Sequence, residues 1–199
     1  MRPPRRGDAQ DFLFSVPTIC DEIPPALLSA SDVESDVYQL HEDDWRQVEF
    51  VSIAQMSTVE LNLVEIRKVR QQQVGAGFPS VHVRPEPRHS LAGVELTRRE
   101  FAASVGPVVK DYVGAGFCGH DTWIAGSFAV QITDEVTAYG LEHGGGLQVV
   151  GFAGVKQDAV KRLLAKVTPL LHSHGLILVA WQTAVVYPQR PDALSRNRD

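Results

Sequence analysis

The chain has 199 residues, of which 44% are hydrophobic and 22% are charged, and its formal net charge is −5. These proportions are typical of a globular protein and exclude a collagen-like or largely disordered chain. No apolar run approaches the ~20 residues needed to span a bilayer, and residues 1–6 lack the apolar stretch of a signal peptide. We therefore expect a cytoplasmic protein with no membrane partner.

The two ends and the first quarter of the chain have weak structural patterns. Residues 1–8 and 188–199 are polar and show no hydrophobic periodicity, so we expect disordered tails on a single domain of residues 9–187. Phe12–Phe14 suggests a short strand, but prolines interrupt the rest of residues 9–45.

A strand, a helix and a second strand follow. Gln47–Ile53 is rich in β-branched and aromatic residues, which predicts a strand. Ser57 and Glu60 have the spacing of a capping box and predict a helix that runs to about Gln73. Val81–Val83 predicts a short strand, so this part of the chain is interpreted as a β-α-β unit.

A second helix is predicted in the middle of the chain. Thr97 and Glu100 form another capping box, and apolar residues keep a helical spacing as far as Gly114. Gly106–Pro107 must kink or break this helix, because proline lacks a backbone N–H. Residues 127–132 predict the next strand.

The C-terminal third carries the strongest pattern. Residues 135–141 and 147–152 predict two strands joined by the hairpin loop His143–Gly146. Apolar residues between Val160 and His174 recur with the period of one buried helical stripe. Residues 176–181 are continuously apolar, which predicts a strand covered on both faces.

These elements predict an α+β fold. The expected architecture is a single mixed, mostly antiparallel sheet with about three covering helices, in the order β-α-β-α-β-β-β-α-β. The alternative is a doubly wound α/β fold. Three successive strands between residues 127 and 152 argue against it, because regular α/β folds alternate strand and helix.

The charge is distributed unevenly along the chain. Residues 9–60 contain eleven acidic residues and one basic residue, Arg46. A negative field of this density repels phosphate backbones and attracts basic surfaces. We therefore expect a basic protein partner and no nucleic-acid partner.

The densest group of polar side chains is His41–Arg46. All of these residues except His41 are predicted to bind the partner, namely Glu42, Asp43, Asp44, Trp45 and Arg46. His41 is a candidate metal ligand, because carboxylates beside an imidazole could hold a hard metal ion. A solvated acidic turn, in which Asp43 or Asp44 caps a helical turn, is the favoured interpretation.

Cys118, His120 and Asp121 lie in a glycine-rich stretch and are the candidate catalytic residues. A thiolate near an imidazolium is the reactive form of cysteine, and His41 or His143 could join the group in space. Lone cysteine and histidine residues are more often packing or surface groups. No cofactor motif is present, because the run of glycines in the hairpin loop precedes a strand and not a helix, so we expect no cofactor.

Three hypotheses for function remain open at this point. The first is a non-enzymatic interaction protein, of the inhibitor or immunity type, that uses its acidic N-terminal region. The second is a small hydrolase or metal-assisted enzyme that uses Cys118 and His120. The third is a self-associating module with the hairpin or the last strand at the interface.

Overall fold

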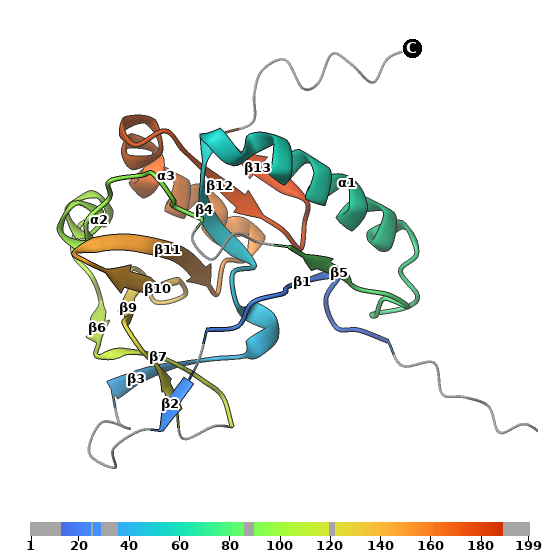
Figure 1. The fold of residues 1–199 in the computed structure, drawn as a ribbon, viewed down its shortest axis with the longest axis horizontal. Coiled ribbons are helices and arrows are strands. Elements are labelled where there is room, and N and C mark those ends of the chain that lie inside the picture. Colours follow the sequence, from blue (N-terminus) through green and yellow to red (C-terminus); the bar gives the residue numbers. More distant parts are fainter. Residues whose placement is uncertain (1–12, 25, 29–35, 86–89, 120–121, 189–199) are drawn as a thin grey trace, which may run out of the picture.

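Antiparallel strands form the centre of the molecule (Figure 1). The computed structural model describes residues 13–24, 26–28, 36–85, 90–119 and 122–188. All pairings in the large sheet are antiparallel. Within the described residues this sheet has seven strands, in the spatial order β13 (Val185–Tyr187), β12 (Leu176–Ala180), β4 (Val48–Ser52), β11 (Gly146–Ala153), β10 (Thr137–His143), β9 (Ser127–Gln131) and β6 (Lys110–Tyr112).

Shorter ladders and helices surround the sheet. Two ladders are parallel and pair β1 (Thr18–Cys20) with β5 (His82–Arg84) and β3 (Val37–Leu40) with β7 (Gly114–Phe117). A third ladder is antiparallel and pairs β2 (Ala26–Leu28) with β8 (Thr122–Ile124). The helices described are the 3₁₀ turns η2 (Glu42–Asp44) and η3 (Ile53–Gln55) and the α-helices α1 (Met56–Gln71), α2 (Arg98–Val105) and α3 (Gln157–Ser173). None of them is long and apolar enough to cross a membrane.

The hairpin of β10 and β11 is closed by glycines. Gly144 and Gly145 have φ values of 61° and 82°, and two such residues in succession match the twist of a tight hairpin. The strands then pair from His143 and Gly146 outward, with a register shift between Leu141 and Glu142. The hairpin predicted from the glycine-rich loop is therefore confirmed.

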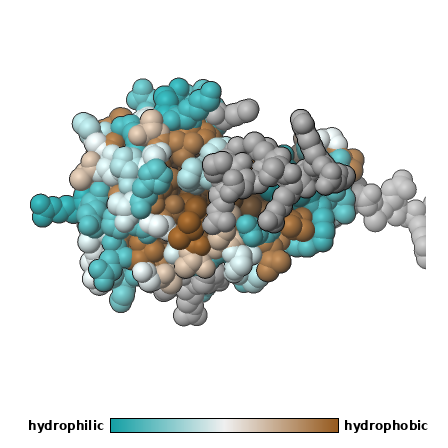
Figure 2. All heavy atoms as spheres, turned by 90° about the horizontal axis from the view of Figure 1, so that it is seen from above, coloured by the Kyte–Doolittle hydropathy of each residue, from teal (hydrophilic) through white to brown (hydrophobic). Residues whose placement is uncertain are grey.

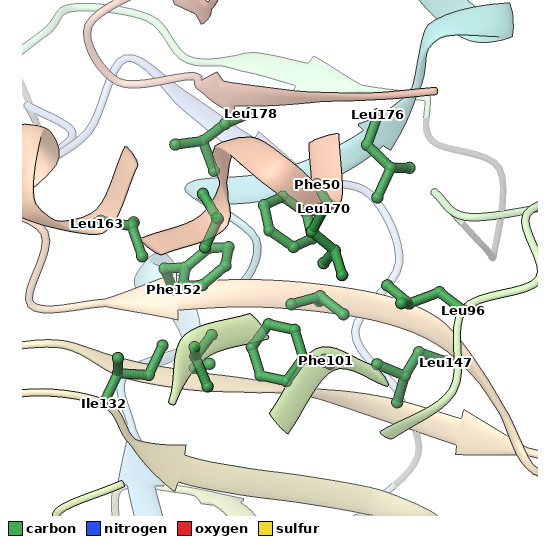
Figure 3. Packing of buried hydrophobic residues seen from close by; sticks show 14 of the residues in the cluster. Phe50, Leu96, Phe101, Ile132, Leu147, Phe152, Leu163, Leu170, Leu176 and Leu178 are labelled. Carbon is green, nitrogen blue, oxygen red and sulfur yellow. The ribbon is translucent and has the colours of Figure 1, made fainter. Parts of the chain in front are cut away.

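One face of the large sheet is covered by α2 and α3 (Figure 3). Phe50 of β4 lies among the apolar residues of this face, and its ring centroid is 4.9 Å from that of Phe152 and 6.3 Å from that of Phe101. Leu163 and Leu170 of α3 pack against the same cluster. The middle of the apolar stripe predicted for this helix is buried (Leu163, Val167, Leu170 and Leu171), because its spacing places those residues on one side.

The opposite face carries two separate apolar clusters. Val51 and Val179 form one of them with α1. Val149 and Tyr139 form the other with Trp45 and the β3–β7 ladder. Neighbouring residues of a strand face opposite sides of a sheet, so Phe50 and Val51 belong to different cores. Polar side chains lie between the two clusters, and they form the site described below.

Three predicted elements are corrected by the structure. β5 pairs with β1 and not with β4, so the predicted β-α-β unit is not a unit of one sheet. The first helix begins at Met56 with Gln55 as N-cap, and no side chain caps it, so Ser57 lies inside the helix. The predicted break at Gly106–Pro107 is confirmed, since α2 ends at Val105, but the residues beyond Pro107 form β6 and β7 and not a continued helix.

The α+β class is confirmed in its coarse form by three α-helices and a large antiparallel sheet within the described residues. The antiparallel pairings do not fit the doubly wound α/β alternative. Short strands that the sequence pattern missed, among them β1, β3 and β7, stand between the predicted elements. The predicted tails lie outside the described residues except for Pro188.

Both edge strands of the large sheet, β13 and β6, are three residues long. Short edges limit strand-to-strand association. The surface also carries apolar groups: Leu61 of α1 is 71% exposed, and Figure 2 shows hydrophobic residues gathered in the middle of the face seen from above. Self-association through the hairpin or the last strand stays a prediction.

Candidate functional site

The predicted acidic site is a surface turn, η2, which directly follows β3. His41 caps this turn, since its Nδ1 accepts a hydrogen bond from the Asp43 amide at 3.2 Å. Ser15 reaches the turn from the N-terminal part of the chain and donates a 2.9 Å hydrogen bond to Asp43 Oδ2. Glu42 and Asp44 are exposed, and Asp43 is half-buried. The turn therefore presents carboxylates to solvent.

Trp45 and Arg46 were predicted to bind a partner, and the structure places both in the interior. Each is 2% exposed, so neither side chain can touch a partner in this fold. The Trp45 ring packs against Phe117 at 5.8 Å and Tyr139 at 5.4 Å between ring centroids. Arg46 has a φ of 57°, a left-handed conformation that costs a non-glycine residue about 1–3 kcal/mol. The part of the predicted set that reaches the surface is Glu42–Asp44, in which Glu42 and Asp44 are exposed and Asp43 is half-buried.

Buried side chains hold the acidic turn from behind. The Tyr139 hydroxyl accepts a hydrogen bond from the Arg46 amide at 2.8 Å and donates one to the Asp44 carbonyl at 2.9 Å. Gln47 Nε2 donates to the Asp43 carbonyl at 2.7 Å. Burial raises the pKa of Tyr139, so its hydroxyl remains a donor at neutral pH. We call Tyr139 and Gln47 the turn clamp.

Next to the turn clamp lies a buried polar seam made of Arg46, Glu49, Arg84 and Trp181. Glu49 is fully buried and accepts hydrogen bonds from Arg46 Nε and from Trp181 Nε1, both at 2.8 Å. The guanidinium of Arg84 lies 4.7 Å from the centroid of the Trp181 ring and donates to the Arg46 carbonyl at 3.1 Å. The seam joins β4, β5 and the end of β12 between the two apolar clusters.

The sequence contained a signal for part of this seam. Glu49 is the one charged residue of β4, a strand that is otherwise apolar except for Ser52, and Arg46 is the one base among residues 9–60. A carboxylate in a strand that is covered on both faces needs a partner, and the nearest base stands three residues before it. Arg84 and Trp181 gave no comparable signal, because their partners are remote in sequence.

The acidic residues of the N-terminal region do not form one continuous patch. Glu49 is paired inside the protein, and Asp36 binds Lys110 at 2.9 Å between Oδ1 and Nζ. Glu60 lies on α1, in a different part of the fold from η2. Asp11, Asp32 and Glu34 lie outside the described residues. The local negative charge at the turn is therefore smaller than the count along the sequence.

The candidate nucleophile Cys118 is exposed and lies beside the acidic turn. Its amide donates to the Leu40 carbonyl at 2.9 Å, which places Cys118 and His41 one residue beyond the ends of two paired strands. His120 and Asp121 lie outside the described residues, and His143 is on the β10–β11 hairpin. Thiol chemistry at Cys118 stays a hypothesis with one described imidazole nearby.

No group of three or more His, Cys, Asp or Glu side chains among the described residues is arranged to hold a metal ion. His41 therefore has no set of metal ligands there. Its Nδ1 faces the Asp43 amide and lies 3.9 Å from Asp43 Oδ2, so the described role of His41 is to cap η2.

Replacement of Tyr139 by phenylalanine tests the turn clamp. Tyr139→Phe keeps the ring but leaves the Arg46 amide and the Asp44 carbonyl without their partner, which is expected to lower the free energy of unfolding by about 1–3 kcal/mol. Urea unfolding measures the loss. Tyr187→Phe is the matched control, since the Tyr187 hydroxyl bonds to no described residue, and equal losses in the two variants would contradict the clamp.

The chain was also compared with known proteins. Neither a protein-family model, nor a curated protein, nor a solved structure matches it.

Proposed function

We propose that this chain is a non-enzymatic cytoplasmic interaction protein that binds a basic protein partner through the acidic turn Glu42–Asp44, in the manner of an inhibitor or immunity protein. The single observation that carries the proposal is the turn clamp, which fixes from the buried side the backbone of a surface turn with three successive acidic residues. These hydrogen bonds fix the backbone of the turn, whereas an unsupported acidic loop would present its carboxylates in many geometries.

The physical advantage of such a turn is preorganisation. Binding orders side chains and loops at an interface, and each immobilised group costs about 0.5–1.5 kcal/mol. A turn whose backbone is already held by buried hydrogen bonds avoids part of this cost. Its carboxylates also attract a basic surface over a distance of about one Debye length, which speeds association.

Neutralisation of the turn tests the proposal. The immobilised chain is exposed to native lysate, and the proteins that it retains at low salt are identified and purified. The association rate of each of them is then measured with the parent chain, with a variant of the turn and with a control variant. The triple variant Glu42→Gln, Asp43→Asn, Asp44→Asn is expected to associate about tenfold more slowly than the parent, because the steering charge is lost. Raising the salt concentration is expected to slow the parent by a similar factor.

The matched control removes the same charge elsewhere. Glu60→Gln, Glu95→Gln and Asp134→Asn change three exposed acidic residues that lie outside the turn. This control is expected to slow association by less than about twofold, since only net charge changes. If the two triple variants slowed association equally, or if binding did not depend on salt, the role proposed for the turn would be contradicted.

A further inference from the structure

His82 lies where three segments of the chain meet. They are β5, α1 and residues 13–21, which we call the N-terminal strap. The amide of His82 donates to the Pro17 carbonyl at 3.0 Å, and its carbonyl accepts from the buried Thr18 hydroxyl at 2.8 Å. The ring Nε2 lies 2.8 Å from Asn62 Oδ1 on α1. One histidine therefore joins the strap to the body of the protein.

The state of the imidazole ring follows from the hydrogen bonds around it. Asn62 Nδ2 donates to the Thr58 carbonyl at 3.2 Å, which turns Oδ1 of the same amide toward His82. An amide oxygen only accepts, so Nε2 of His82 carries a proton and donates. The neutral ring satisfies this contact, and a second proton on Nδ1 would add a positive charge in a partly buried place.

Burial and the neighbouring positive charge of Arg84 oppose that second proton. Burial lowers the pKa of His82, and the positive charge of Arg84, two residues along the same strand, lowers it further. Arg84 is fully buried and donates to the Thr18 hydroxyl at 3.3 Å, so it belongs to the same junction. Glu65 of α1 acts in the opposite direction, and β1 contributes the uncharged Thr18.

We propose that His82 makes the N-terminal strap an acid-sensitive clasp, in which protonation of the ring loosens the strap from β5. Thr18 of the strap is the register partner of His82 in the parallel β1–β5 ladder, so their side chains are neighbours on the same face of that ladder. When the strap leaves, this side of the ring gains water and the ring binds a proton more readily than in the closed state. The closed state is therefore fully stable above about pH 6.5, the ordinary pKa of histidine, and is lost progressively as the pH falls below it.

The clasp also reaches the acidic turn. Ser15 lies on the strap, and its hydroxyl is bonded to Asp43 of η2. Opening of the strap would break the hydrogen bond between Ser15 and Asp43. The inference does not depend on the proposed function, but it links acid to the geometry of the same turn.

Hydrogen exchange tests the clasp directly. The amides of Phe14 and Asp21 donate to the carbonyls of Phe78 and Arg84, so their protection reports strap closure. Between pH 7.5 and 5.5 their protection factors, corrected for intrinsic exchange, are expected to fall by about threefold to tenfold, since one proton changes the opening constant by at most about tenfold per pH unit. Protection within β10 and β11 is expected to stay constant.

Two variants separate His82 from other acid effects. His82→Gln keeps a donor for Asn62 and cannot titrate, so its strap protection is expected to be independent of pH. Asn62→Asp places a carboxylate opposite the ring and favours the charged form, so protection is expected to hold or rise in acid. His143→Gln, at an exposed histidine on the hairpin, is expected to behave as the parent does.

Each outcome of these experiments either supports or overturns the proposal. The clasp is supported if the protection of the strap amides is independent of pH in His82→Gln but falls in acid in the parent and in His143→Gln. A parent without a fall in protection, or a fall of the same size in His82→Gln, overturns it. If His82→Gln does not fold, Asn62→Asp decides, since a fall equal to that of the parent in this variant also overturns it.

Discussion

Glu49→Ala is expected to lower the free energy of unfolding by about 3–5 kcal/mol. The carboxylate is fully buried and accepts hydrogen bonds from Arg46 and Trp181. Its removal leaves a buried guanidinium without this counter-charge and an indole N–H without its acceptor. Desolvation of the remaining groups, and not the strength of the lost contacts alone, makes the effect large.

The measurement is urea or thermal unfolding of the parent, Glu49→Ala and the double variant Arg46→Met, Glu49→Leu. The double variant replaces the ion pair by apolar side chains of similar size, so it is expected to recover part of the stability lost in Glu49→Ala. A loss below about 1 kcal/mol in Glu49→Ala would contradict a buried pair. Exposed pairs such as Lys68 with Glu65 are expected to contribute less than that.

Gly140→Ala is expected to destabilise the protein by about 3 kcal/mol or more. A Cβ at this position of β10 would stand 1.8 Å from the Val149 carbonyl oxygen and 2.7 Å from its carbonyl carbon. These atoms belong to the backbone of β11 and cannot turn away as a side-chain end can. The two central strands would have to separate, which weakens the ladder that carries Tyr139 and the turn clamp.

Gly146→Ala is the matched control in the same hairpin. A Cβ there meets no atom closer than 3.9 Å, and its backbone does not need a positive φ. Its stability is therefore expected to stay within about 0.5 kcal/mol of the parent in the same denaturation experiment. Similar losses in the two alanine variants would mean that close strand contact at Gly140 is not the cause.

The elements with a strong pattern were predictable because their physics is local. The stripe of α3, the apolar run of β12 and the glycines of the hairpin each determine a structure within a few residues. The β3–β7 ladder was missed, because each strand has four residues and pairs with a partner more than seventy positions away. The break at Gly106–Pro107 was predictable from the proline, and α2 ends at Val105. The strands that follow were missed, because their apolar residues also fit a helical spacing.

The candidate site was predictable only in its position. The carboxylates of Glu42–Asp44 lie at the surface, as their composition indicates, and no pattern within them revealed the support from Tyr139 on a strand 95 residues further along. Trp45 and Arg46 were grouped with them because they are adjacent in the chain. Adjacency in the chain does not decide which way a side chain points, and the Arg46 side chain is buried, at a residue with a positive φ.

By itself, the sequence determined the class of the fold, the strongest helix and hairpin, and the position of an acidic turn, because composition and periodicity decide which segments bury one side. Tertiary structure alone decided which remote strands pair, that Glu49 meets both Arg46 and Trp181, and that His82 contacts both the N-terminal strap and α1. Those contacts depend on the packing of remote segments, and their energies arise from burial, which one segment cannot specify.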